Sequence, residues 1–264
     1  MTNRTRISVI VPCFNHGQFL EESVGSVIGC GRKDTELIVV DDGSTDARTQ
    51  DELDKLSRHG VTVIRQENKG PSAARNAGLR SACGQYILPL DADDRLRDGW
   101  IDKALRIVDE NPDVGVVYGD AQFFGVSKER WRSGPFDADR LLAWNYILAC
   151  SLFKRSIWEQ AGGYDEAKVV QGFEDWELWI GALGHNWKFV YLPEIFFDYR
   201  KGGDSMFTRA YESKYAIAEY VARKHSPLYR EALLRHEREQ LSIVAAARHL
   251  GELIVTRTKR KCGF

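Results

Sequence analysis

The sequence predicts an α/β fold: a mostly parallel, Rossmann-like sheet with a helical extension at its C-terminal end. Through residues 7–118, short runs rich in β-branched residues alternate with segments of helical periodicity. The strand-like runs are continuously apolar, which is typical of parallel strands covered on both faces. After Phe207 only helical patterns remain. We therefore expect a domain over residues 1–205 and a helical extension over 206–264.

The elements follow one another in a regular order. In the first half, strands are expected at 7–11, 36–40, 61–64, 86–90 and 114–118. Helices are expected at 18–30, after the N-cap Thr45, at 71–83 and at 98–109. The later pattern predicts strands near 149–153, 188–192 and 195–199, and helices at 174–183 and from 226 onward.

Composition excludes several classes of protein. The 264 residues carry a formal net charge of −1, which argues against a nucleic-acid binder. No apolar run approaches the roughly 18 residues that span a bilayer. The five cysteines form no CxxC pair, so we expect free thiols in a reducing cytoplasm.

The two parts differ in charge. Residues 206–264 contain 12 Lys and Arg against 6 Glu, whereas residues 1–205 contain 25 basic and 32 acidic residues. The basic end, 257–264, is either a solvated terminus or a tail that attracts anionic lipid headgroups. The helices before it are expected to pack on the domain, cover an acceptor site or mediate a homodimer.

Three polar tetrads follow predicted strands, at 12–15, 41–44 and 91–94. The carboxyl ends of parallel strands meet at one edge of a sheet, where ligands bind, so these tetrads should converge. Asp91 and Asp93 could reach a divalent cation, although acidic residues after strands also serve as turns. Arg75, in the first turns of the helix expected at 71–83, suits either a phosphate or a surface ion pair.

A second acidic motif, Glu174-Asp175-Trp176, opens the helix expected at 174–183. Carboxylates at a helix start stabilise the helix dipole, and either one could instead serve as a general base beside an acceptor hydroxyl. Trp176 and Trp179 read as core residues, although an aromatic ring at a site can stack on a sugar.

Taken together and in order, these segments resemble the family 2 glycosyltransferases, which have the GT-A fold. The resemblance covers residues 5–206. It rests on Ser8–Asn15, Glu36–Asp46, Asn68–Asn76, Asp91–Asp94 and Glu174–Trp176. It implies an inverting, metal-dependent transfer of one sugar from a nucleoside-diphosphate sugar, with a UDP-sugar favoured. The acceptor would be a glycan or a lipid-linked molecule in cell-surface polysaccharide or glycoconjugate assembly.

The resemblance also implies residue roles. Asp175 would be the catalytic base, with Glu174 and Trp176 near the acceptor. Asp93, with Asp91, would ligate Mn²⁺ or Mg²⁺. The nucleotide-sugar site would comprise Pro12, Phe14, Asn15, Asp42, Arg75 and Asp91, with Asp42 on the nucleobase and Arg75 near the diphosphate. Asp41 would be structural.

Two departures from the family pattern matter. Many members have a metal-ligating His shortly after the Tyr-Arg of the last strand, where this chain has Gly202. Metal binding could then be weaker, Asp204 could substitute, or the metal could arrive mainly with the nucleotide. The Gln-x-x-Arg-Trp signature of polymerising members is absent, since Ser127 precedes Arg130-Trp131. Together with the absence of a membrane-spanning run, this predicts transfer of single sugars by a cytoplasmic enzyme. Its basic tail would be either a solvated terminus or a peripheral contact with the inner face of the membrane.

Three other readings remain. A non-catalytic nucleotide-sugar binding module would keep the donor site without turnover. A phospho-accepting receiver domain is disfavoured because the acidic pair of a receiver follows its first strand, whereas Asp41-Asp42 follows the second predicted strand of this chain. A nucleotidyltransferase is disfavoured because the sequence has no Gly-rich, Arg-containing N-terminal loop.

Overall fold

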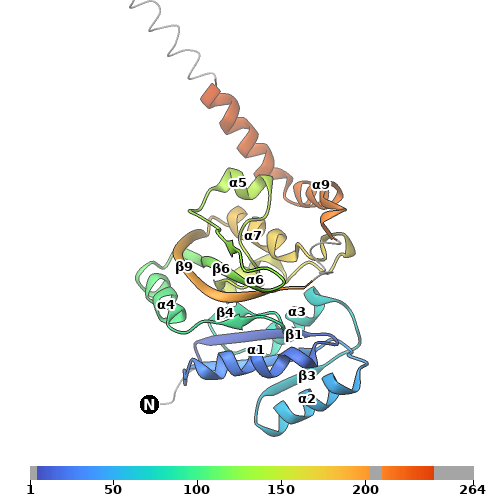
Figure 1. Ribbon diagram of the computed structural model, residues 1–264. Helices are drawn as coiled ribbons and strands as arrows, with labels where there is room; N and C mark the ends of the chain where they lie inside the picture. The colour runs from blue at the N-terminus through green and yellow to red at the C-terminus, as the bar shows by residue number, and fades with distance from the viewer. Residues whose placement is uncertain (1–4, 203–209, 241–264) are drawn as a thin grey trace, which may run out of the picture. The chain divides into compact units, whose positions relative to one another are not determined.

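The computed structural model describes residues 5–202 and 210–240 of the chain. Within them, a mixed sheet of nine strands is flanked by helices, which confirms the α/β class (Figure 1). The strands are β1 Ile7–Cys13, β2 Thr35–Asp41, β3 Thr62–Arg65, β4 Tyr86–Pro89, β5 Arg95–Leu96, β6 Val114–Gly125, β7 Arg130–Trp131, β8 Leu152–Lys154 and β9 Lys188–Lys201. The helices are α1 Gly17–Gly29, α2 Ala47–Arg58, α3 Pro71–Ser81, α4 Trp100–Glu110, α5 Ala138–Ala143, α6 Arg155–Ala161, α7 Glu174–Gly184 and α9 Lys214–Lys224, with a 3₁₀ turn at Lys168–Val170.

The strand order is β3-β2-β1-β4-β8-β6-β9-β5, with β7 paired to β6. The first four strands are mutually parallel, and β6 and β9 form a second parallel pair. Between them β8 runs antiparallel to both β4 and β6. The parallel strands β1, β2 and β4 bring their carboxyl ends to one edge, where the polar tetrads lie.

Side chains of alternating strand residues face two different helical layers. Val9 and Val39 belong to the apolar cluster that includes residues of α1, α2 and α4. Their neighbours Ile10 and Val40 point the other way, against Gly78 of α3, where an added Cβ would lie 2.7 Å from Ile10 Cγ2. This burial on both faces explains why the strands read as unbroken apolar runs.

The second half of the sheet departs from the predicted pattern. The strands expected at 188–192 and 195–199 are one strand, β9, whose pairing with β6 shifts register near Tyr118–Ala121. Pro193 is accommodated at this irregularity, because a missing N–H is tolerated where the ladder is interrupted. The strand expected at 149–153 lies at Leu152–Lys154 instead.

The compact unit that carries the sheet extends to Val221, and a second unit begins at Ala222. Ile217 and Val221 of α9 are buried, and Tyr220 Oη donates a hydrogen bond to Asp165 Oδ2 at 2.8 Å. The predicted boundary at 205/206 stays a prediction. Helix 226–240 is present as expected, whereas the basic tail at 257–264 lies outside the described residues.

Two further sequence expectations can be checked on this part of the chain. Among the residues described, no helix has the length and apolar character needed to cross a membrane. The four cysteines that the structure describes are all free thiols, as expected: Cys13, Cys30, Cys83 and Cys150.

Candidate active site

Asn15 fastens the loop after β1 to the loop after β2. Its Oδ1 accepts hydrogen bonds from the backbone N of Thr45 at 2.8 Å and of Asp46 at 3.3 Å. Its own backbone N donates to Ser44 Oγ at 3.0 Å. Asn15 has a φ of 55°, in the left-handed region that asparagine tolerates better than most residues. This side chain shapes the edge of the site, and its contact with a nucleotide sugar stays a prediction.

Phe14 stands beside this junction and is 44% exposed. Pro12 is partly exposed at the end of the same strand. An exposed aromatic ring can stack on a planar base, so both residues remain candidates for the lining of a base pocket.

Asp42 is 4% exposed, and its carboxylate holds the loop 66–70. Oδ1 accepts from Lys69 N at 2.9 Å and Gln66 Nε2 at 2.7 Å, and Oδ2 accepts from Gly70 N at 2.8 Å. An ionised carboxylate has about four lone-pair sites, so roughly one remains for another donor. The predicted nucleobase contact would have to use that site.

Both carboxylate oxygens of the neighbouring Asp41 accept hydrogen bonds from within the protein. Its Oδ1 accepts from Ser44 N at 2.9 Å, and its Oδ2 accepts from Gln50 Nε2 at 3.2 Å. Gly43, inside the turn, has a φ of 76°, and an added Cβ would lie 2.7 Å from Asn68 N. A residue with a side chain would therefore strain the backbone and separate two loops of the site.

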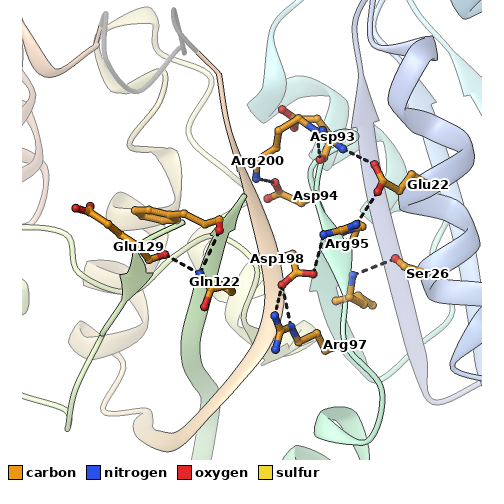
Figure 2. Close-up of polar contacts among 12 residues, drawn as sticks. Glu22, Ser26, Asp93, Asp94, Arg95, Arg97, Gln122, Glu129, Asp198 and Arg200 are labelled. Carbon is orange, nitrogen blue, oxygen red and sulfur yellow. Dashed lines mark hydrogen bonds and ion pairs between the residues drawn. The ribbon is translucent and has the colours of Figure 1, made fainter. Parts of the chain in front are cut away.

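The acidic loop after β4 is anchored by Arg200 of β9 (Figure 2). The Arg200 backbone N donates to Asp94 Oδ1 at 2.8 Å, and its Nε donates to the Asp93 carbonyl at 2.9 Å. The guanidinium also pairs with Glu22 of α1 and lies 4.4 Å from the centre of the Phe19 ring. The backbone of the acidic loop is thus fixed between α1 and β9.

The ionised forms of Asp93 and Asp94 in this loop are disfavoured by their surroundings. Burial and the charge of Asp91 raise the pKa of Asp93, and burial with the charges of Asp91 and Asp93 raises the pKa of Asp94 well above its usual value. The backbone N–H of Asp93 itself and the charges of His16 and Arg200 oppose the rise at Asp93 only in part. The three carboxylates of this loop therefore repel one another, although Asp91 is ion-paired with Arg75 and Asp94 accepts a hydrogen bond from the Arg200 backbone N.

A divalent cation fits this charge. The Asp91 side chain is 39% exposed, and Asp93 is partly exposed, so oxygens of both remain within reach of a ligand. Mg²⁺ is commonly held by one or two carboxylates and completes its shell with phosphate and water. In the described part of the chain no three His, Cys, Asp or Glu side chains come together as a full metal cluster. Asp204, the suggested substitute for the family's His, lies outside that part.

Arg75 links the two acidic motifs. It is 4% exposed; its Nη2 donates to Asp91 Oδ1 at 2.7 Å and its Nη1 to Glu174 Oε1 at 2.5 Å. Burial alone would lower the pKa of Arg75, but the two carboxylates more than offset this and raise it. The guanidinium therefore faces protein carboxylates in this structure, and its predicted contact with the diphosphate stays a prediction.

The motif at the start of α7 has two carboxylates with different partners. Glu174 Oε2 accepts from Gly172 N at 2.6 Å, which leaves Glu174 occupied at both oxygens. Asp175 is 8% exposed; Oδ1 accepts from Trp176 N at 2.8 Å and Oδ2 from Asn145 Nδ2 at 3.1 Å. Burial and the charge of Glu174 raise the pKa of Asp175 to about 7. A carboxylate with a pKa near neutrality is well matched to general-base chemistry.

Trp176 is fully buried, and its Nε1 donates to the carbonyl of Leu141 at 2.7 Å. Its ring is therefore not open to an acceptor in this structure, and the predicted acceptor contact stays a prediction. The partly exposed Trp144 lies at this edge instead, with ring centres 5.4 Å from Trp176 and 5.8 Å from Tyr211.

Sequence reasoning did not single out Asn145 or assign a role to Arg200. Asn145 lies in a segment without a recognisable motif, 30 residues before Asp175. Arg200 was used only to locate the position of the absent His, although its place in the last strand, next to the predicted site, could have suggested a contact with the acidic loop.

Comparison with known proteins finds a matching family model and similar chains. Residues 8–167 match the family model described as Glycosyl transferase family 2. Glycosyltransferase GlyA of Streptococcus pneumoniae is 29% identical over 227 residues, covering 85% of this chain and 30% of that protein. The putative teichuronic acid biosynthesis glycosyltransferase TuaG of Bacillus subtilis is 37% identical over 114 residues, covering 42% of this chain and 45% of that protein. The chain thus spans less than half the length of these two relatives.

Solved structures share the fold. Residues 1–349 of S. aureus TarS superpose with a TM-score of 0.64 at 20% identity, covering 82% of this chain and 64% of that one. TarS has also been solved with UDP-GlcNAc. Mannosyltransferase PcManGT from Pyrobaculum calidifontis, in complex with GDP-Man and Mn²⁺, has a TM-score of 0.60 at 23% identity, covering 78% and 59%. The predicted GT-A fold is confirmed.

Proposed function

The chain belongs to glycosyl transferase family 2, and we propose that it transfers a single sugar from a nucleoside-diphosphate sugar to an acceptor hydroxyl with inversion at the anomeric carbon. One observation carries the proposal. Asp175 is a buried carboxylate with a pKa raised to about 7, and its neighbour Glu174 is joined through Arg75 to Asp91 of the acidic loop. The proposed base and the acidic loop proposed to bind the metal thus belong to one connected group of side chains.

The proposed reaction is a single displacement. The acceptor oxygen forms a bond to the anomeric carbon and gives its proton to the Asp175 carboxylate. The bond from that carbon to the diphosphate oxygen breaks, and the nucleoside diphosphate leaves with the electron pair. Asp91 and Asp93 would hold Mn²⁺ or Mg²⁺, which would neutralise charge on the departing diphosphate.

We propose a UDP-sugar as the donor. Structural neighbours that share the fold have been solved with UDP-GlcNAc or with GDP-Man and Mn²⁺, which supports a nucleotide-sugar donor without distinguishing the base. A thermal-shift screen of UDP, GDP, dTDP and CMP, each with and without Mn²⁺, would rank them, because stabilisation follows affinity. A protein that no nucleoside diphosphate stabilises would contradict the donor site.

The proposed acceptor is a glycan or lipid-linked intermediate in cell-surface polysaccharide assembly. The similarity to TuaG, whose printed name refers to teichuronic acid biosynthesis, supports this class. A cytoplasmic location, membrane contact through the tail at 257–264 and a homodimer remain predictions of the sequence.

Asp175→Asn tests the base. The exchange keeps the size of the side chain and removes its capacity to take a proton, so we expect transfer to fall by about 10²–10⁴-fold with nucleotide affinity unchanged. The measurements are product formation and calorimetric binding of the nucleoside diphosphate.

Asp51→Asn is the matched control, because Asp51 is exposed on α2 and undergoes the same chemical change. Retained turnover in Asp175→Asn would remove the base assignment. Nucleotide-sugar binding without turnover in the unaltered protein, across a panel of acceptors, would favour the non-catalytic binding module. Retention of configuration in the product, read by NMR, would contradict a single displacement.

A further inference from the structure

Two tryptophans of α7 clamp one segment of the chain against the helix. Trp176 Nε1 donates to the Leu141 carbonyl at 2.7 Å, and Trp179 Nε1 donates to the Ile147 carbonyl at 3.1 Å. Both indoles are fully buried, so these hydrogen bonds are shielded from water. The segment 141–147 is consequently held at both ends on the helix that begins with Glu174-Asp175.

Asn145 lies between the two clamped ends. Its Oδ1 accepts from Ile147 N at 3.3 Å, which directs the amide nitrogen the other way. That nitrogen, Nδ2, donates to Asp175 Oδ2 at 3.1 Å. With Trp176 N on Oδ1 at 2.8 Å, the plane of the Asp175 carboxylate is fixed from both sides.

The surroundings of Asp175 are otherwise unfavourable to its charge. Burial and the charge of Glu174 disfavour the ionised form, whereas Asn145, the Trp176 backbone N and the charge of Arg75 favour it. Of these, Arg75 is already paired with Glu174 and Asp91. The phenol groups of Tyr164, which is buried, and Tyr199, which is partly buried, also lie in electrostatic reach of Asp175, and their pKa values are raised above the usual range. Asn145 is therefore the side chain that hydrogen bonds directly to the charged form.

We propose that Asn145 is a positioning residue that orients the Asp175 carboxylate toward the acceptor hydroxyl and keeps it ready to accept a proton. The inference rests on the proposed function, since it presumes that Asp175 is the base. It adds Asn145, which belongs to no recognisable sequence motif, to the residues of the proposed active site. Asn145 lies in a segment that hydrogen bonds from Trp176 and Trp179 hold in place. These two tryptophans thus act on the site through Asn145.

The test is the pH dependence of kcat in Asn145→Leu and Asn145→Asp. Asp175 must be ionised to act, so the acidic limb of the profile follows its protonation. Asn145→Leu removes the donor at similar volume and should move that limb about 1 pH unit upward, the size expected for one hydrogen bond to a charged group. Asn145→Asp replaces the donor with a second acid and should move the limb further. The order wild type, Leu, Asp is the signature of the proposal.

A purely structural role would lower kcat equally at every pH and leave the limb in place, and that outcome overturns the proposal. Asn111→Asp, on an exposed residue at the end of α4, is the control and should keep the wild-type profile. If Asn145→Leu fails to fold, the nearly isosteric Asn145→Asp decides the question alone. If Asp175→Asn is inactive but both Asn145 variants keep the wild-type profile, only the Asn145 assignment fails; if Asp175→Asn stays active, the base assignment fails first.

Discussion

The carboxylates after β2 and those after β4 lie at the same edge of the sheet but are held in different ways. Asp42 accepts three hydrogen bonds, two of them from backbone N–H groups of the loop 66–70. Asp93 is fixed through its backbone carbonyl instead, while burial and Asp91 raise the pKa of its carboxyl. Asp42 therefore holds protein loops together in this structure, whereas the Asp93 side chain stays partly exposed and could contact a ligand, as the proposed function requires.

Of the two carboxylates compared, Asp93 should have the larger effect on catalysis when it is replaced in Asp93→Asn. Loss of one carboxylate should lower kcat/KM by about 10²–10³-fold, because the developing charge on the diphosphate would lose its cation. The fold should be unaffected or slightly stabilised, since a charge repelled by Asp91 is removed. Turnover, calorimetric Mn²⁺ affinity in the presence of nucleotide, and Tm are the measurements. A large drop in Tm would show that the Asp93 side chain stabilises the fold as Asp42 does, and would contradict the proposed difference between the two carboxylates.

Asp42→Ala should instead lower the stability of the fold. The backbone N–H groups of Lys69 and Gly70 would lose a buried acceptor, which should lower the free energy of unfolding by about 2–3 kcal/mol. For a domain of this size that corresponds to a Tm lower by roughly 4–12 °C. Urea unfolding followed by circular dichroism measures the first quantity and a thermal scan the second. Unchanged stability with a loss of nucleotide affinity would place Asp42 with the ligand-binding carboxylates.

The smallest effect concerns the stability of Asp175→Asn. Because the folded protein raises the pKa of Asp175 to about 7, it binds this proton more tightly than the unfolded chain does. Ionisation of the group therefore costs stability progressively as pH rises from about 4 to 7. Asp175→Asn should raise Tm by a few degrees at pH 8 and by less at pH 5. A Tm that rises equally at both pH values would mean that folding does not raise the pKa of the Asp175 carboxyl.

Much of the fold follows from local sequence. The apolar runs of β1, β2 and β4, each followed by a polar turn, predict the parallel edge because burial on both faces leaves an unbroken pattern. The two-residue strands β5 and β7 have no such pattern, since they exist only through pairing with β9 and β6. The continuity of β9 across Pro193 likewise depends on a register shift in its partner.

The site divides in the same manner. Asp91, Asp93 and Asp175 lie in short motifs that the sequence exposes. The contact between Asn145 and Asp175, and the ion pair between Arg75 and Glu174, join segments 30 and 99 residues apart. Their formation depends on tertiary packing, which no local pattern records.

The bridge from Asp91 through Arg75 to Glu174 has a consequence for how this chain can diverge. Loss of the Arg75 guanidinium would leave two carboxylates without their counter-charge, and loss of either carboxylate would leave buried guanidinium N–H groups without an acceptor. Lysine offers a single ammonium in place of the fork and cannot serve both carboxylates in this geometry. Exchanges at these three positions should be strongly epistatic, harmful singly and tolerated in concert. Sequence change in the loop after β4 is thereby tied to sequence change at the start of α7.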